Sequence, residues 1–307
     1  MADQPRHSSD RLPNNSAEGS NKLEAIGKKK KRKFQVSNSY PLDFDQLARL
    51  INFLFENRDQ KKIKRAFIQE EIGFADRHVE SLISIGTAMG LIKPNLQILS
   101  PVGLLVAQHD VFIEQKATLQ WCHYKGAGTY HNIIWYEIFN ALLRVEQPMI
   151  QEQWNQYFRN LLAGQYSKRT LNKGVAEEVQ FIVDAYQNRN FSKLGLLLKA
   201  QNGVLYCKRH TEFELHIFAA IIYDYCSNSG SSLQQVEDLV GMPGSPPVLF
   251  GLDLTTFREL VEDLHEHGWL RYETTHKLDQ IRLKPGYSVL DFIASYYEER
   301  SPQVVGE

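Results

Sequence analysis

The sequence predicts a mainly helical protein with small β-hairpins, in which two winged-helix modules are joined by a helical middle and preceded by a disordered basic arm. Apolar residues recur at helical spacing over most of the chain. Twice, around residues 91–99 and 269–283, that spacing changes to short alternating strands after a group of helices. The first 39 residues contain few branched apolar side chains and many Ser, Asn, Lys and Pro, a composition typical of disorder.

We therefore expect five segments. They are an arm at 1–39, an N-terminal winged-helix domain at 40–116, a helical middle domain at 117–208, a C-terminal winged-helix domain at 209–300 and a tail at 301–307. The longest apolar runs are far shorter than the roughly 20 residues that a membrane span needs, so no membrane contact is predicted. Without an apolar signal segment or closely spaced cysteines, a cytoplasmic location is expected.

The arm carries most of the unbalanced positive charge. Residues 1–40 hold nine Lys or Arg against four Asp or Glu, a net charge of +5, and the remainder holds 26 against 32, a net charge of −6. Six consecutive cations form a run: Lys28, Lys29, Lys30, Lys31, Arg32 and Lys33. We expect this run to contact the phosphates of double-stranded DNA or to act as an import signal, and a solvated linker is the competing explanation.

In the first module, Asp43 can cap a helix over FDQLARLINFLFEN, and a basic stretch then offers a second helix that ends near Gly73. A third helix starts at Asp76, and the strands LIKP and LQIL follow before a helix after Pro101. In a winged helix the third helix can enter a major groove. Its expected exposed residues are Arg77, His78, Glu80, Ser81, Ser84 and Thr87. The predicted DNA contacts outside the arm are Lys61, Lys62, Lys64, Arg65, Arg77, His78, Ser81 and Lys93.

The middle, about 117–200, is predicted to be helical throughout, with helices near 129–143, 149–163 and 171–187. Its aromatic residues at helical spacing indicate a core, and the alternative is a stacking surface for unpaired bases. They are Trp121, Trp135, Tyr136, Phe139, Trp154 and Phe158.

In the second module we expect helices at 212–226 and over SSLQQVEDLV, then a loop, GMPGSPPVLFG. A helix capped by Asp253 and ended by Gly268, the strands WLRYET and LDQIRL, and a last helix follow. The helix after Asp253 carries four acids against Arg258 alone: Glu259, Glu262, Asp263 and Glu266. Because these acids repel phosphates, we expect this acidic module to bind protein partners rather than to read DNA through that helix.

The sequence favours a protein without enzymatic activity over an enzyme. No GxxxxGKS, GxxxxGKT or strand followed by GxGxxG occurs, and no cofactor or metal site is predicted. The enzymatic alternative is a DNA nickase, in which Asp110, Glu114 and Lys116, with His123 nearby, hold Mg²⁺ or Mn²⁺ at a phosphate. Asp110 and Glu114 lie one helical turn apart, however, and a solvated helix end explains them more simply.

Four segments between Phe34 and Pro148 resemble a known family: SYPLDFDQLARLINFLF, IGFADRHVESLISIGTAMGLIKP, LSPVGLLVAQHDVFIEQKATLQWCHY and TYHNIIWYEIFN. The family is an uncharacterised bacterial domain family encoded beside phosphoadenylyl-sulfate-reductase-like genes in DNA phosphorothioation and phage-defence loci, and the second component of the Ssp system is similar to it. Its pattern "LSP.G" and "D.F.E...TL.W..H" is matched by Leu99 to Gly103, Asp110, Glu114, Thr118, Leu119, Trp121 and His123. Where the family has "G.GKNMV.SI", this chain has FADRHVESLI, so no DNA contact by that lysine–asparagine pair is carried over.

The resemblance implies a DNA-binding accessory or scaffold subunit of such a system, with a sulfurtransferase or an ATPase subunit as partner. It also implies strand nicking as an alternative, and it supplies no catalytic residues. The fold pattern leaves a winged-helix transcription regulator as a further alternative.

Overall fold

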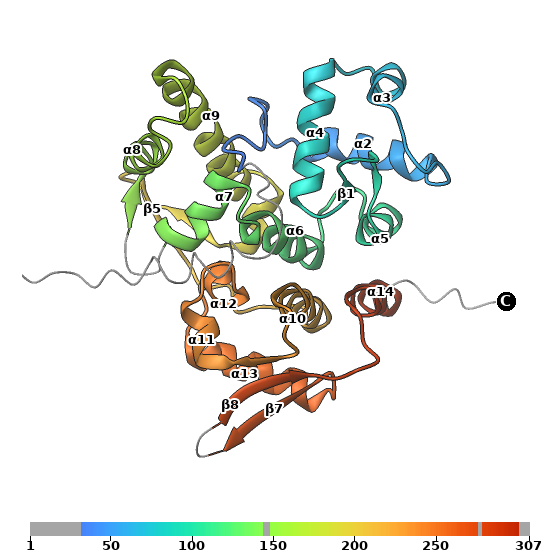
Figure 1. The fold of residues 1–307 in the computed structure, drawn as a ribbon, viewed down its shortest axis with the longest axis vertical. Coiled ribbons are helices and arrows are strands. Elements are labelled where there is room, and N and C mark those ends of the chain that lie inside the picture. Colours follow the sequence, from blue (N-terminus) through green and yellow to red (C-terminus); the bar gives the residue numbers. More distant parts are fainter. Residues whose placement is uncertain (1–31, 144–147, 276–277, 301–307) are drawn as a thin grey trace, which may run out of the picture. The chain divides into compact units, whose positions relative to one another are not determined.

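The computed structural model describes residues 32–143, 148–275 and 278–300, and its first regular elements are three short helices followed by a hairpin and a fourth helix (Figure 1). The elements are α2 (Phe44–Glu56), α3 (Arg65–Ile72), α4 (Asp76–Ala88), β1 (Ile92–Lys93), β2 (Ile98–Leu99) and α5 (Pro101–His109). Their order is the predicted one. Asp43 caps α2 by accepting a hydrogen bond from the backbone N–H of Gln46 at 3.0 Å.

The LSP.G motif makes the junction between the hairpin and α5. The Ser100 hydroxyl accepts from the Gly103 N–H at 2.9 Å and donates to the Gly90 carbonyl at 2.7 Å. Pro101 fills the first helical position, where no N–H is needed. A Cβ on Gly103 would lie 2.0 Å from the Leu91 carbonyl oxygen, so only glycine allows this approach.

The middle of the chain combines helices with a small sheet. Its helices are α6 (Lys116–Gly128), α7 (Ile133–Glu137), the π-helix η1 (Ile138–Leu142), α8 (Gln151–Leu161), α9 (Lys168–Gln187) and the 3₁₀-helix η2 (Asn190–Leu194). The strands β3 (Met149–Ile150), β5 (Val204–Cys207) and β4 (Leu197–Lys199) form an antiparallel sheet in that order. The prediction of helix throughout is therefore wrong here, because runs as short as these do not distinguish a strand from a buried helix.

The C-terminal part contains a second three-stranded sheet, with the order β6–β8–β7. The elements are α10 (Leu215–Ser229), β6 (Leu233–Gln235), α11 (Val236–Gly241), α12 (Pro246–Phe250), α13 (Leu254–Glu266), β7 (Leu270–Thr275), β8 (Leu278–Leu283) and α14 (Val289–Arg300). Asp253 caps α13 through the Thr256 N–H at 2.9 Å, as predicted. Two expectations are corrected. Residues 233–235 pair with β8 instead of starting a helix, and the expected loop contains α12.

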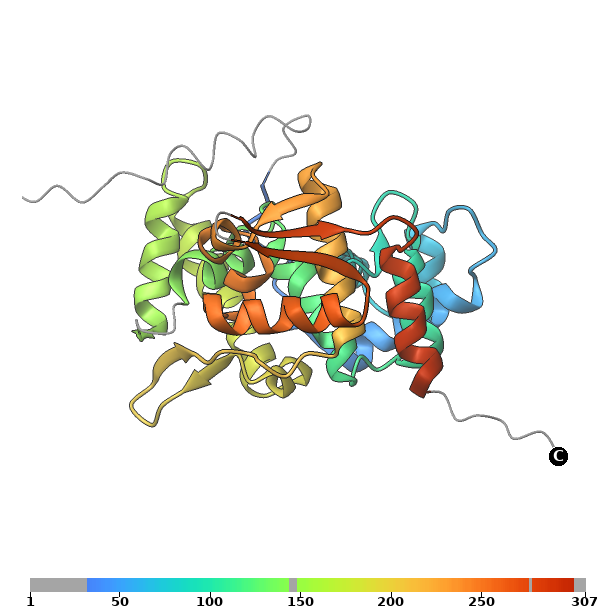
Figure 2. The ribbon, with the colours of Figure 1, turned by 90° about the horizontal axis from the view of Figure 1, so that it is seen from below.

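One hydrophobic core runs through all of these elements, and α6 lies at its centre (Figures 1 and 2). This helix contacts α4, α7, α10 and α12, while α14 packs against α5 and α10. The six aromatic residues predicted to form a core are all buried, with at most 6% exposure for Tyr136. None of the described helices is long and apolar enough to span a membrane. The described residues belong to one compact unit that begins at Arg32.

Candidate nucleic-acid interface

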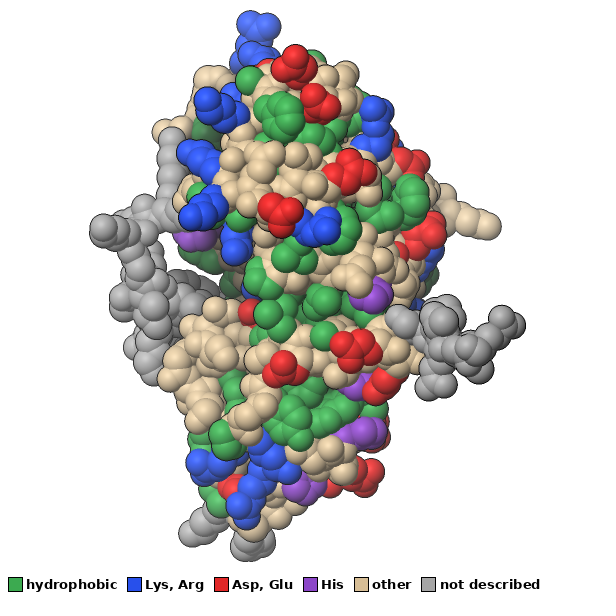
Figure 3. All heavy atoms as spheres, turned by 90° about the vertical axis from the view of Figure 1, so that its right-hand side faces the viewer, with side chains coloured by type: hydrophobic (Ala, Val, Ile, Leu, Met, Phe, Trp, Pro, Cys, Tyr) green, Lys and Arg blue, Asp and Glu red, His purple; other side chains and the backbone are tan. Residues whose placement is uncertain are grey.

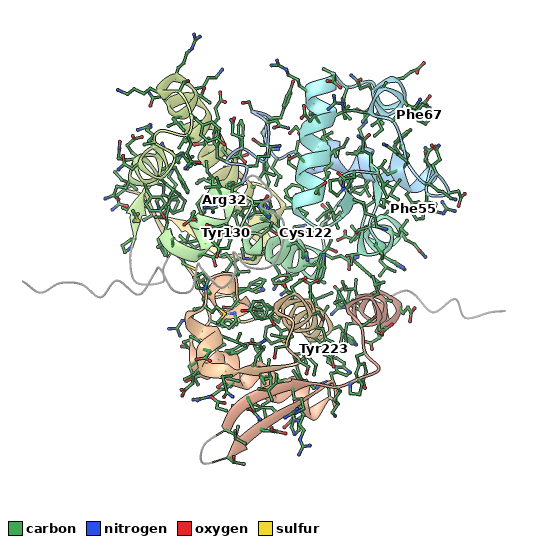
Figure 4. The ribbon with its side chains drawn as sticks, in the orientation of Figure 1. Arg32, Phe55, Phe67, Cys122, Tyr130 and Tyr223 are labelled. Atoms are coloured by element: carbon green, nitrogen blue, oxygen red, sulfur yellow. The ribbon has the colours of Figure 1, made fainter. Side chains whose placement is uncertain are left out.

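The last two cations of the basic run are held by the folded part, and Lys28–Lys31 lie outside the described residues. The Arg32 guanidinium stacks 3.7 Å from the centre of the Tyr130 ring, donates to the Tyr130 carbonyl at 2.9 Å and pairs with Glu137 at 3.1 Å (Figure 4). Lys33 donates its N–H to the His131 carbonyl at 2.8 Å. Its ammonium donates to the Ser84 hydroxyl at 3.0 Å, and partial burial lowers the pKa of Lys33.

Residues 33–40 form a strap that joins α9 to α4. On the α9 side, the carboxylate of Glu178, which is only 2% exposed, accepts the N–H groups of Val36 and Ser37 at 2.8 and 3.2 Å. Burial raises the pKa of Glu178, and the hydrogen bonds from the strap oppose that shift. On the α4 side, the Ser81 hydroxyl donates to the Ser37 carbonyl at 2.5 Å. The Tyr40 ring stacks on the His78 ring at 4.6 Å.

The strap changes two expectations. Residues 32–39 were expected to be disordered, yet Phe34 and Val36 are buried in the core. The predicted exposed face of α4 is also largely covered. Ser81 is fully buried, while His78, Ser84 and Thr87 are half-buried, so of this set only Arg77 and Glu80 are exposed. A duplex therefore cannot reach Ser81 while the strap is in place.

Four of the predicted contacts come together at an edge of the first module. Lys61, Lys62 and Lys64 are exposed, and the N–H of the buried Ile63 between them donates to the Leu96 carbonyl at 3.0 Å. This bond holds the segment against the β1–β2 turn, whose first strand ends at the exposed Lys93. We call Lys61, Lys62, Lys64 and Lys93 the lysine edge.

The lysine edge carries unbalanced charge. Residues 58–65 hold five Lys or Arg against one acid, a net charge of +4. None of the four lysines forms an ion pair within the described ranges. Arg65 differs, because its guanidinium pairs with Asp76 at 2.7 Å and lies 3.7 Å from Glu80. Figure 3 shows this side of the molecule, with Lys and Arg side chains spread among acids over its upper part.

The four residues of the nickase alternative have separate partners. Asp110 is buried, and its carboxylate accepts the N–H groups of Glu114 at 2.9 Å and Gln115 at 3.0 Å, so it caps the turn before α6. Burial raises the pKa of Asp110. The Glu114 side chain is exposed. Lys116 forms an ion pair at 2.6 Å with Glu212, which lies in the loop before α10.

His123 lies in the core with both ring nitrogens engaged. Its Nε2–H donates to the Leu249 carbonyl at 3.0 Å, so Nδ1 accepts from the Tyr186 hydroxyl at 2.5 Å. The Trp135 indole N–H in turn donates to Tyr186 at 3.0 Å. Burial lowers the pKa of His123 to about 3. Among the described residues, no group of three or more His, Cys, Asp or Glu could hold a metal ion.

The acids of α13 are exposed, as the sequence predicts. Glu259, Glu262, Asp263 and Glu266 lie on one helical face, and within the described part of the chain none of them pairs with a cation. The nearby Arg258 is bound instead to Asp279 at 2.6 Å. This face is therefore a stripe of four uncompensated negative charges.

The family model described as "Protein of unknown function (DUF4007)" matches residues 69–297, well over half of the chain. The chain therefore belongs to this family. Two solved structures share its fold. "Magnesium ion-bound SspB crystal structure" matches with a TM-score of 0.66 and 14% identity, over 90% of this chain and 91% of that one. "SspB crystal structure" matches with a TM-score of 0.64 and 14% identity, over 87% of each chain. No curated protein matches the sequence. The resemblance drawn from the sequence is confirmed at the level of family and fold.

Proposed function

We propose that this chain is a DNA-binding accessory and scaffold subunit of a bacterial DNA phosphorothioation or phage-defence system. The observation that supports DNA binding best is the lysine edge, where a backbone hydrogen bond gathers four exposed and unpaired lysines. Cations of this kind bind phosphates and release the counterions condensed on DNA. Membership of the DUF4007 family and the fold shared with SspB support a place in such a system.

The element order supports a winged-helix interpretation of the first module. Helices α2, α3 and α4 precede the β1–β2 hairpin, and α5 follows it. In this proposal the hairpin turn and the segment before α3 contact the DNA backbone, together with the cations that precede Arg32 in the sequence. Because the strap covers much of α4, backbone contact predominates over base reading.

The scaffold role is assigned to the acidic stripe of α13. Four exposed acids on one helical face favour a basic partner surface, and they disfavour DNA at the same place. The sulfurtransferase or ATPase subunit of the same system is the partner that we propose.

Fluorescence anisotropy with the full chain and a labelled 30-base-pair duplex tests DNA binding. Changing Lys61, Lys62 and Lys64 to Gln removes up to three phosphate contacts. It should therefore weaken binding and reduce the slope of log K against log salt by about 2 to 3. The control changes Lys168, Arg169 and Lys173 to Gln, because these residues are equally exposed on α9. Equal affinity and slope for the two triple variants would contradict the proposal.

One observation favours a second function, metal-dependent DNA nicking. A structure with this fold is described as magnesium-bound SspB. Incubating the purified chain and supercoiled plasmid with Mg²⁺ or Mn²⁺ tests it, with Glu114→Gln and Lys116→Gln as variants. Both side chains reach the surface, so these changes spare the fold better than Asp110→Ala, which removes a buried cap. Open circles that the variants fail to form would support nicking, and intact plasmid with either metal would reject it.

A further inference from the structure

Two arginines face each other across the C-terminal sheet. In the antiparallel register of β7 and β8, Arg271 lies directly opposite Arg282, with side-chain exposures of 65% and 49%. Like charges at directly opposite positions destabilise a sheet. The pair is therefore not explained by the stability of the fold.

One carboxylate lies between the two arginines. Glu273 is 3.0 Å from Nε of Arg271 and 4.0 Å from Nε of Arg282, so two cations share one anion. Its other oxygen accepts from the Gln280 amide at 2.6 Å. Within the described residues, neither guanidinium donates a hydrogen bond. This sheet face therefore retains one unit of positive charge and unused guanidinium donors.

The opposite side of the same module is acidic. Helix α13 packs on the other face of the sheet, where Arg258 binds Asp279 and the Tyr272 N–H donates to His265. The four acids of the α13 stripe are exposed, so the module has a basic sheet face and an acidic helix face. The lower part of Figure 3 shows this separation, with Lys and Arg side chains on one side and acids on the other.

We propose that the outer face of the β6–β8–β7 sheet is a second contact for the DNA backbone, in which Arg271 and Arg282 bind phosphodiester oxygens. Guanidinium groups bind phosphate through two parallel N–H donors, and directly opposite residues place their Cβ atoms about 5 Å apart. Two such groups suit one phosphate or two neighbouring ones. The exposed amide of Gln235 beside them adds a hydrogen-bonding group without charge, whereas Gln280 is buried and its amide is already bonded to Gln235 and Glu273. This inference rests on the proposed DNA-binding function.

The experiment uses the full chain, the same duplex and the variant Arg271→Gln/Arg282→Gln. Losing two phosphate contacts should reduce the salt slope by about 2 and weaken binding at 0.1 M salt by about tenfold or more. The variant should unfold at nearly the same temperature, because the cross-strand repulsion that it removes offsets the ion pair with Glu273 that it loses. Glu273→Gln should tighten binding, since it removes the anion that competes with phosphate. The control is Arg159→Gln/Arg300→Gln, in which each arginine pairs with its own carboxylate at 2.8 and 2.5 Å.

Each outcome decides the inference. A double variant that unfolds at a lower temperature but keeps the affinity and salt slope assigns the arginines a structural role and overturns it. A second outcome concerns polyglutamate, used as a probe for an acidic protein. If the unmodified chain binds polyglutamate and the double variant does not, while both bind DNA equally well, the face binds a protein and the inference is also overturned. In both cases the proposed function stands if the Lys61/Lys62/Lys64 variant binds DNA weakly. If the unmodified chain does not bind the duplex at low salt, the proposed function itself fails.

Discussion

The buried histidine network makes acid stability a measurable property of this fold. His123 is fully buried and neutral, because Nε2–H donates to Leu249 while Nδ1 accepts from Tyr186. Its pKa falls from 6.5 to about 3 in the folded state. Between these values the unfolded chain binds a proton that the folded chain excludes, so stability decreases as the pH falls.

The size of the effect follows from the shift. Each pKa unit corresponds to about 1.4 kcal/mol, so the folded state should lose on the order of 5 kcal/mol between pH 6.5 and pH 3 through this residue alone. His210 adds to the loss in the same direction, because burial also lowers its pKa. Urea unfolding, followed by circular dichroism at half-unit pH steps, measures the slope.

His123→Gln removes the titrating group. The variant should be less stable at neutral pH by about 1–3 kcal/mol, because a buried hydrogen bond is lost or distorted. Its stability should also depend less on pH, by up to about 1.4 kcal/mol per pH unit below pH 6.5. The control is Tyr186→Phe, which breaks the same network but keeps the imidazole. A pH slope that His123→Gln leaves unchanged would refute the assignment of a neutral buried histidine.

Three further predictions concern the fold and the arm. Gly103→Ala should destabilise the chain by about 3 kcal/mol or more in thermal unfolding, because the new Cβ would lie 2.0 Å from the Leu91 carbonyl oxygen. The control is Gly241→Ala, which should destabilise the chain far less because the space around that position is open. Ser81→Ala removes the hydrogen bond to the strap, so amide hydrogen exchange over 33–40 should become faster; unchanged exchange would mean that the other contacts suffice. Deleting residues 1–31 should weaken DNA binding and lower its salt slope without loss of stability, while deleting 1–39 should also lower the unfolding temperature because it removes buried residues.

Local chemistry made much of the fold predictable. Asp43 and Asp253 cap helices through their own neighbours three residues on, so their role is visible in a short window of sequence. Helical spacing of large apolar residues identified the buried aromatics of the middle. Alternation in WLRYET and LDQIRL identified β7 and β8, because a strand with one buried face repeats every two residues.

Contacts between distant residues were not predictable. The strap depends on Glu178, which lies more than a hundred positions from the backbone N–H groups that it binds, and no local pattern signals that pairing. Residues 233–235 form the strand β6 because they pair with the edge of β8, which lies more than forty positions further along the chain. Likewise, Asp110 and His123 are close in sequence, yet Asp110 caps a turn while His123 is buried in the core with both ring nitrogens hydrogen-bonded.

The sequence by itself determined most of the helices, the caps of α2 and α13, the β1–β2 and β7–β8 hairpins and the family, because each of these structural features depends on residues within about one turn or one strand. Only the tertiary structure decided which polar groups remain free. A side chain is available to a ligand when no distant partner has already taken its hydrogen bonds. By that criterion, Ser81 and His123 are occupied, while the lysine edge and the pair Arg271 and Arg282 keep uncompensated charge.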